Sequence, residues 1–376
     1  MAKLLAKNNH VYYVDRPVTL RDWVKDRNTK EIKRRKPHFF SAGNSFIETD
    51  TPNLKVIITP PVPSINMLPE GPLYRLAVKM NEWIVGGRLK KIIKKLGIKD
   101  FIFINSFNFY YPTLHQLLKP TLTVYQCLDP LIRAYEVKHG ITSEAILAKQ
   151  VDVIICSSKE LFTNKKLLNK NTFFIPNAAD IKHSEQALDL RLPVSAILAD
   201  IKKPIIGYVG AIERRIDYSI LTNLLEQNPD KNFVFVGPVN PDYVDVSKFK
   251  QPNLFFKGTV PYSEMPAVLK GFDVAIIPFK KDEVSRTIFP LKLFEYLGSG
   301  RPVVSTDFNT DLADFTGDTV AYCQNVNEFT TALNIALEDT PELQQKRLDV
   351  AAKNTWEHRI VQIENLLADS LKLKQG

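Results

Sequence analysis

Short apolar segments alternate with helical patterns along the whole chain. In the first half, apolar and β-branched runs predict strands at 10–14, 56–58, 101–104, 122–126, 153–156 and 172–175. The second half repeats the series at 205–209, 232–236, 254–256, 274–277, 302–305 and 320–322. Strands that alternate with helices are typical of parallel sheets covered by helices. We therefore predict an α/β protein with two Rossmann-like, doubly wound parallel-sheet domains.

The segment between the two series sets the domain boundary. A chain of 376 residues exceeds what one hydrophobic core usually organises. Residues 180–203 carry no strand pattern and contain Pro193, which is typical of an interdomain connection. We expect an N-terminal domain at 1–182 and a C-terminal domain at 183–354.

The chain begins with a helical pattern where a strand is expected. Residues 1–9 predict the end of a helix that leads directly into the strand at 10–14. A doubly wound domain normally opens with a strand and a glycine-containing turn. The first strand of the N-terminal domain is therefore expected to be missing, either because the sheet lacks it or because the start codon lies inside a longer gene.

Charge is distributed unevenly within the net +9 of the chain. Residues 1–180 contain 28 lysines and arginines against 15 aspartates and glutamates, which leaves 22 against 26 for the remainder. A basic half attracts nucleic acid or an anionic membrane surface. In residues 88–96, four lysines separate apolar positions at helical spacing. A helix packed on a core with solvated lysines and a basic amphipathic helix on a membrane both fit this pattern.

Neither a membrane span nor a metal site is predicted. No run approaches the twenty apolar residues of a spanning helix, and no secretion signal is present, so we expect a cytoplasmic protein. Cys127, Cys156 and Cys323 lack metal-ligand or disulfide spacing. Isolated histidines and the Val85-Gly-Gly-Arg88 sequence do not support an NAD enzyme.

Residues 285–305 carry the most informative pattern. A polar loop leads to Pro290 at the start of a short helix, and Gly298 and Gly300 end that helix before a strand. Free amide groups at a helix start bind anions such as a diphosphate, and Lys292 adds a positive charge. Glu295, one turn later, could accept hydrogen bonds from ribose hydroxyls or could be an ordinary exposed helix residue.

From residue 205 to 305 the chain resembles retaining glycosyltransferases with two Rossmann-like domains facing a cleft, the GT-B architecture, especially those of bacterial envelope and exopolysaccharide biosynthesis. The resemblance rests on five motifs: Gly207-Tyr-Val-Gly210 with Asp217, Val236-Gly-Pro238, 256–262, 272–279 and 290–305. Weaker matches lie at 125–129, 156–158 and 176–180. The final helix, 355–376, resembles the segment that returns to the N-terminal domain in this family.

The resemblance implies a nucleotide-sugar donor site in the C-terminal domain. Glu295 would bind the ribose, and the base and diphosphate would contact the remaining donor-site residues. These are Gly210, Arg214, Arg215, Gly237, Gly258, Val260, Thr287, Ile288, Phe289, Pro290, Leu291 and Lys292. Many relatives carry a second glutamate where this chain has Thr287, and an arginine where it has Ala211. These departures leave open how the sugar hydroxyls are held.

The catalytic residues implied are Lys292, Arg215 and Asp129. The two cations would stabilise the leaving diphosphate, with Arg214 as an alternative to Arg215, although both arginines could equally be surface residues. Asp129 would orient the acceptor or the transferred sugar, or it caps a turn before Pro130. No Asp-x-Asp triplet is present, so the sequence implies no metal and no other cofactor.

We predict a glycosyltransferase of the hexosyltransferase type that uses a UDP- or GDP-sugar. The expected acceptor is a growing saccharide or a lipid-linked molecule at the inner face of the plasma membrane, and nucleic acid is not an expected partner. A catalytically inactive sugar- or nucleotide-binding subunit and a sugar-nucleotide epimerase are the alternatives. Aromatic residues at 107–111 follow a strand and could stack on a sugar ring or belong to the core.

Overall fold

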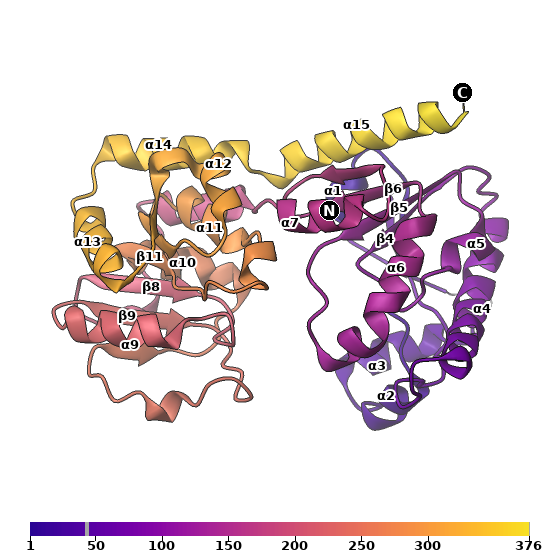
Figure 1. Ribbon diagram of the computed structural model, residues 1–376, viewed down its shortest axis with the longest axis horizontal. Helices are drawn as coiled ribbons and strands as arrows, with labels where there is room; N and C mark the ends of the chain where they lie inside the picture. Colours follow the sequence, from indigo (N-terminus) through magenta and orange to yellow (C-terminus); the bar gives the residue numbers. More distant parts are fainter. Residues whose placement is uncertain (42–44, 376) are drawn as a thin grey trace. The chain divides into compact units, whose positions relative to one another are not determined.

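A computed structural model describes residues 1–41 and 45–375 (Figure 1). The chain divides into two compact units. Unit 1 consists of Met1–Ile175 and Ile360–Gly376, and unit 2 consists of Pro176–Arg359. The division therefore falls before the boundary expected at residue 182, because Ala179 and Ile181 belong to the hydrophobic core of unit 2.

Unit 2 contains one parallel sheet in the order β10-β9-β8-β11-β12-β13. Its strands are β8 (Ile205–Val209), β9 (Asn232–Val236), β10 (Leu254–Phe256), β11 (Val274–Ile277), β12 (Val303–Thr306) and β13 (Val320–Cys323). Numbered within the unit, this is the order 3-2-1-4-5-6 of the doubly wound nucleotide-binding fold. The six strands and the fold class predicted for this half are confirmed.

Helices flank this sheet and bury its apolar strands (Figure 1). They are α8 (Ile181–Ser184), α9 (Tyr218–Gln227), α10 (Met265–Gly271), α11 (Leu291–Gly298), α12 (Ala313–Thr316), α13 (Val326–Leu337) and α14 (Pro341–Lys353). α13 contacts β12, β13 and α9, and α11 contacts α8 and α14. The strands are largely apolar because both faces of a parallel sheet are covered.

The described residues of unit 1 form two sheets, so the expectation that the six strands predicted for this half belong to one Rossmann-like sheet is wrong. The four-stranded sheet has the order β4-β5-β6-β7, with β4 (Ile102–Ser106), β5 (Leu122–Cys127), β6 (Val153–Cys156) and β7 (Thr172–Phe174) all parallel. The three-stranded sheet has the order β1-β3-β2, with β1 (Val11–Val14) parallel and β2 (Phe46–Glu48) antiparallel to β3 (Leu54–Ile57). β2 has only three residues and shows no alternation long enough to be recognised.

The helices of unit 1 include the two for which the sequence shows a helical pattern, at residues 1–9 and 88–96. They are α1 (Ala2–Leu5), α2 (Leu20–Lys25), α3 (Lys30–Arg35), α4 (Pro72–Lys95), α5 (Leu114–Leu118), α6 (Ile141–Gln150) and α7 (Lys159–Lys166). α1 leads into β1, as the pattern of residues 1–9 predicts. α15 (Trp356–Gln375) starts in unit 2 and continues in unit 1, where Ile360, Ile363 and Leu367 pack in a core with β5 and β6.

The lysine-rich stretch at 88–96 lies almost entirely within the 24-residue helix α4. Leu89 and Ile92 are buried in the same core as Val85 and Leu114. The apolar side of this stretch is therefore a core contact, as one of the two interpretations predicts, and its lysines point away from that core.

Candidate active site

The candidate site lies where β8, β9 and β10 end. Gly210 and Gly237 come directly after β8 and β9, and Gly258 comes two residues after the end of β10. The amide of Gly210 donates to the carbonyl of Val236 at 2.9 Å, and the amide of Gly237 donates to the carbonyl of Gly258 at 2.7 Å. Ligands of doubly wound sheets bind at the carboxyl ends of the strands, and the three glycines lie at that edge.

Two of these glycines have backbone conformations and neighbours that exclude a side chain. Gly210 has φ +142° and Gly237 has φ +148°, in the region that favours glycine. A Cβ on Gly237 would overlap the carbonyl oxygen of Gly210, and a Cβ on Gly210 would overlap Nζ of Lys292. The missing side chain at Gly210 therefore gives Lys292 its space.

Lys292 lies in the first turn of α11 and points toward aromatic rings. Its Nζ is 3.7 Å from the ring centroid of Tyr208 and 5.2 Å from that of Phe279. Burial lowers the pKa of Lys292 well below its usual range, and the nearby Arg215 lowers it further. Within residues 1–41 and 45–375, its ammonium group has no hydrogen-bond acceptor. Glu295 and Glu213 raise this pKa only in part, and an anion bound beside the ammonium group would favour its charged form further.

Tyr296 fixes α11 against the end of β8, a role that the sequence analysis missed. Its hydroxyl accepts a hydrogen bond from the amide of Val209 at 2.7 Å and donates to the carbonyl of Val209 at 3.2 Å. The tyrosine is fully buried. The sequence shows only a tyrosine next to Glu295 in a predicted helix. Its hydrogen-bond partner, Val209, lies more than eighty residues earlier and could not be inferred from that pattern.

Glu295 lies one turn after Lys292 and is half-buried. Burial raises its pKa, while Lys292 and His183 act in the opposite direction. Its carboxylate accepts no hydrogen bond from the part of the chain that the structure describes. Both oxygens are therefore available to accept two hydroxyl donors, which is the geometry a ribose requires.

His183 and Tyr262 form a stacked pair close enough to Glu295 to influence it electrostatically. Their ring centroids are 4.1 Å apart, and Nε2 of His183 lies 2.8 Å from the carbonyl oxygen of Tyr262. Burial, followed by the charge of Glu295, raises the pKa of Tyr262 to about 12. Tyr262 ends the motif at 256–262, but its stacking on His183 joins two segments about eighty residues apart and could not be inferred from the sequence.

Arg214 and Arg215 differ in how their charges are compensated. Nε of Arg215 forms an ion pair with Glu213, and its guanidinium carbon lies 5.6 Å from the ring centroid of Phe279. Arg214 is half-exposed and has no ion-pair partner among the described residues. Arg215 is therefore part of the group around Lys292, while Arg214 carries the charge that is still available for a ligand.

Most side chains of the stretch that leads into α11 are buried, whereas a loop that faces a ligand would expose them. Thr287, Ile288 and Phe289 are all buried, and the hydroxyl of Thr287 donates to the carbonyl of Val284 at 2.6 Å. Pro290 caps α11, and Leu291 is exposed. The side chains of this stretch are thus largely turned inward, and Leu291 is the residue next to it that is exposed.

Residues 257–260 leave β10 as a loop. Nζ of Lys257 lies 2.8 Å and 3.0 Å from the two carboxylate oxygens of Asp200, so its charge is already compensated. Gly258 is exposed with φ +70°, and Val260 is half-buried against the core. This loop can offer its backbone to a flat ligand group such as the base of a nucleotide.

Asp129 belongs to unit 1 and follows β5. It is exposed. Of the neighbouring aromatic segment, Phe109 and Tyr111 are buried in unit 1, while Tyr110 stacks on Tyr135 at 5.4 Å between centroids. Phe109 and Tyr111 are therefore core residues, and Tyr110 remains partly accessible.

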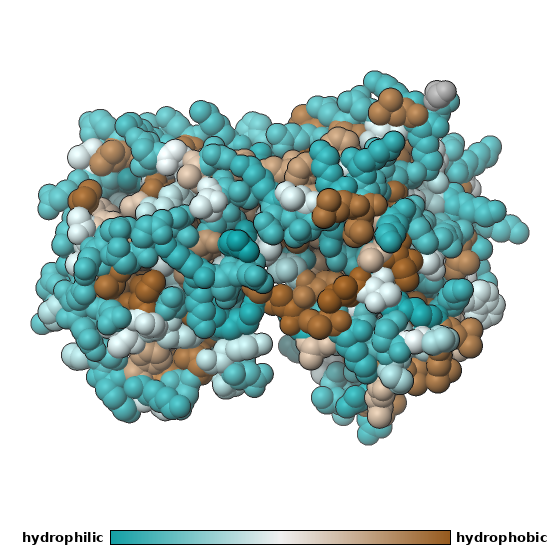
Figure 2. All heavy atoms as spheres, viewed as in Figure 1, coloured by the Kyte–Doolittle hydropathy of each residue, from teal (hydrophilic) through white to brown (hydrophobic). Residues whose placement is uncertain are grey.

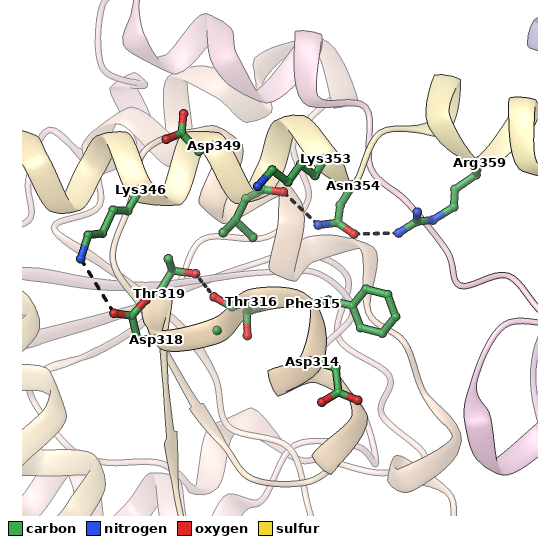
Figure 3. A pocket seen from close by; sticks show the side chains of 12 residues that line it. Asp314, Phe315, Thr316, Asp318, Thr319, Lys346, Asp349, Lys353, Asn354 and Arg359 are labelled. Carbon is green, nitrogen blue, oxygen red and sulfur yellow. Dashed lines mark hydrogen bonds and ion pairs between the residues drawn. The ribbon is translucent and has the colours of Figure 1, made fainter.

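A cavity of about 510 Å³ lies elsewhere in unit 2 (Figure 3). Its walls come from residues 314–319, α14 and the start of α15, and it contains none of the predicted site residues. Lys346 and Asp318 face each other across it at 3.9 Å. We favour the strand ends as the reactive site, because Lys292 and Glu295 lie there, next to the close approach that Gly210 permits.

Among the residues that the structure describes, no three His, Cys, Asp or Glu side chains gather as a metal site. Over the same ranges, no helix has the length and apolar character to cross a membrane.

Comparisons with known proteins agree with this geometry. Residues 203–339 match the family described as glycosyl transferases group 1. TuaH of Bacillus subtilis (strain 168), which carries the name teichuronic acid biosynthesis glycosyltransferase, is 27% identical over 213 residues, 52% of this chain and 53% of TuaH. The match thus spans about half the length of that curated relative.

Solved structures share the fold. Sucrose-phosphate synthase from Thermosynechococcus elongatus has a TM-score of 0.65 at 18% identity, covering 98% of this chain and 90% of its own. A UDP-forming trehalose-phosphate synthase from Burkholderia xenovorans scores 0.63 at 12% identity, with 98% and 100% covered. Anabaena HepE, solved with UDP and glucose, scores 0.59 at 16% identity, with 84% and 86% covered.

Proposed function

We propose that this chain, in which residues 203–339 form a glycosyl transferases group 1 domain, moves a sugar from a nucleoside-diphosphate sugar to a growing saccharide or lipid-linked acceptor. The observation that carries the proposal is a lysine and a glutamate on α11 whose side chains, among the described residues, form no hydrogen bond or ion pair. Lys292 lies at the first turn and Glu295 one turn later, close enough for each to affect the pKa of the other. A nucleoside diphosphate offers phosphates to the lysine and ribose hydroxyls to the glutamate.

The donor would bind across the ends of β8 and β10. Its diphosphate would lie near the start of α11, where Lys292 and free backbone amides provide positive potential. Its ribose would hydrogen-bond to Glu295, and its base would lie against residues 257–260. The solved structure of HepE holds UDP and glucose, which supports a UDP-sugar over a GDP-sugar.

The chain's own residues can assist departure of the diphosphate. As the bond from the anomeric carbon to the diphosphate oxygen breaks, negative charge grows on that oxygen, and Lys292 with Arg214 or Arg215 would stabilise it. Preorganised cations at this position meet the charge requirement of the step. Asp129, an exposed carboxylate in unit 1, would orient the acceptor. Retention at the anomeric carbon follows from the resemblance to retaining GT-B enzymes.

We propose that the acceptor is presented at an anionic membrane surface on the inner face of the plasma membrane. The excess of 28 basic over 15 acidic residues in the first 180 supports such a partner.

One observation favours the alternative of a subunit that binds donor without turnover. Thr287 stands where many resembling enzymes carry a glutamate, and its hydroxyl is engaged by the carbonyl of Val284. A donor sugar would then lose one polar contact. Such a subunit would bind a sugar nucleotide and leave it intact.

Turnover separates the two functions. We predict that purified protein releases free nucleotide slowly from a UDP- or GDP-sugar, with the sugar recovered as free hexose or linked to acceptor. Lys292→Met is expected to reduce this rate at least a hundredfold, and Lys248→Met, an exposed lysine of the same unit, is the matched control. Binding without release in the native protein would establish the inactive subunit, and a changed sugar identity without transfer would indicate an epimerase.

A further inference from the structure

The outer face of α4 in unit 1 carries an apolar stripe that no element within residues 1–41 and 45–375 covers. Leu73, Leu76, Met80 and Trp83 are exposed by 62%, 66%, 46% and 72% of their surface. With about 100° of rotation per residue, these four positions lie within roughly a quarter of the helix circumference. Figure 2 shows apolar atoms interrupting the hydrophilic surface of unit 1 over the region that α4 occupies in Figure 1.

The opposite face of α4 accounts for the stability of the helix. Tyr74, Val78, Val85, Leu89 and Ile92 are all buried. The exposed stripe is therefore dispensable for packing within unit 1. Large exposed apolar side chains gathered on one helix face mark an interaction surface.

Further along the helix, the same face becomes basic. Lys90, Lys91 and Lys94 are exposed and project from the side on which the apolar stripe lies. A surface with apolar side chains followed by lysines complements an anionic layer that overlies hydrocarbon. Trp83, at the junction, is the residue type that concentrates at membrane–water interfaces.

A small cavity of about 100 Å³ adjoins the basic end of α4, lined by residues that include Phe40, Arg88, Lys91 and Lys95. Arg88 is already engaged, because its guanidinium donates to the carbonyl of Ser41 at 2.9 Å and to that of Phe39 at 2.6 Å. Its role is to hold residues 39–41 against α4. Lys91 is shared between this cavity and the basic face, so it can reach an anionic group there.

We propose that the outer face of α4, from Leu73 to Lys94, docks on an anionic phospholipid membrane, with the apolar stripe inserted among the acyl chains and the lysines at the headgroups. The proposal names the surface for the membrane partner of the proposed function, but it is independent of the donor chemistry on α11. A second copy of this chain is a less favourable occupant, because two basic faces would approach each other.

Vesicle co-sedimentation tests the assignment. The full chain should bind vesicles that contain phosphatidylglycerol. It should not bind vesicles made only of phosphatidylcholine. Leu76→Ser with Trp83→Ser should weaken binding at least tenfold. The matched control is Ile335→Ser with Leu343→Ser, two exposed apolar residues on helices of unit 2, which should bind as the native protein does.

The lysines are tested separately. Lys90→Gln with Lys94→Gln should weaken binding by about fivefold for each lysine and reduce its dependence on salt. Lys248→Gln with Lys250→Gln in unit 2 is the control. Because Trp83 is exposed, its fluorescence should shift to shorter wavelength on vesicles, and Trp83→Phe should abolish that shift.

Equal vesicle binding by the native protein and the stripe variant would overturn the proposal, as would equal binding to neutral and anionic vesicles. If the native protein sediments as a dimer and the stripe variant as a monomer, the face would belong to an interface with a second copy of the chain. That result would overturn the membrane proposal as well. Nucleotide release in solution should be unchanged in the stripe variant, so failure of the membrane proposal and failure of the transferase proposal are distinguishable.

Discussion

At the residue scale, the partly buried position of Glu295 lowers the stability of the folded protein at neutral pH. Burial raises the pKa of its carboxyl above the ordinary value of 4.5, so the folded protein holds the proton more tightly than the unfolded chain does. Below the unfolded pKa the carboxyl is protonated in both states and contributes no pH dependence. As pH rises through the window between the two pKa values, stability is lost, and the loss persists at neutral pH.

Replacing Glu295 by Gln should therefore stabilise the free protein near neutral pH. We expect Tm to rise by about 2–4 °C, the shift that ~1 kcal/mol gives in a domain of this size, and the gain should vanish at low pH. Calorimetric melts across pH measure it, with Glu226→Gln on the exposed surface of α9 as the control. A loss of stability in the Gln variant at neutral pH would contradict the assignment.

Lys292 has the opposite titration problem. Burial beside Tyr208 lowers the pKa of Lys292. A bound anion favours the charged form of the amine and raises this pKa again. Nucleotide affinity should fall as pH rises through this lowered pKa, because the neutral amine cannot pair with phosphate. We predict that Lys292→Arg removes this pH dependence, since guanidinium stays charged. The same decline of affinity with pH in the Arg variant would show that another group is responsible.

At the scale of elements, the site depends on how tightly three strand ends approach α11. Gly210 and Gly237 are alike in φ but differ in what a side chain would meet. At Gly210 it would meet the end of the flexible Lys292 chain, and at Gly237 the rigid carbonyl of Gly210. A substitution at Gly210 therefore tests the position of Lys292, and a substitution at Gly237 tests the stability of the fold.

We predict that Gly210→Ala folds with a modest loss of stability and loses nucleotide affinity, because Lys292 must leave its place. Gly237→Ala should lose about 3 kcal/mol or more, since backbone must move against backbone. Thermal melts and nucleotide titrations of both variants measure the contrast. Equal destabilisation by the two substitutions would show that the close approach between Gly210 and Lys292 is not specific.

At the scale of the whole molecule, the two units differ in how well their folds could be predicted. Each strand of unit 2 is a short, mostly apolar run bounded by turn residues, and the strands pair in a standard order, so the apolar pattern was enough to predict them. In unit 1, the pattern located six strands but could not tell which of them pair. Pairing depends on long-range packing, and the three-residue β2 gave no periodic signal.

The site was predictable to a similar degree. A helix start with Lys292 and Glu295 could be recognised locally, whereas Tyr296, which joins α11 to β8, depends on a contact between distant segments. The inward packing of Thr287, Ile288 and Phe289 was equally hidden, because an isolated loop sequence does not reveal which core it meets. The assignment of these residues to a donor stays a prediction.

The most direct test is a calorimetric titration of UDP and of GDP into the full chain and into Glu295→Ala. The account predicts that one nucleotide binds with one-to-one stoichiometry, that Glu295→Ala lowers its affinity at least tenfold through the lost charged hydrogen bonds, and that Glu226→Ala leaves it unchanged. Equal affinity of the native protein and Glu295→Ala would contradict the account, because α11 would then not hold the nucleotide.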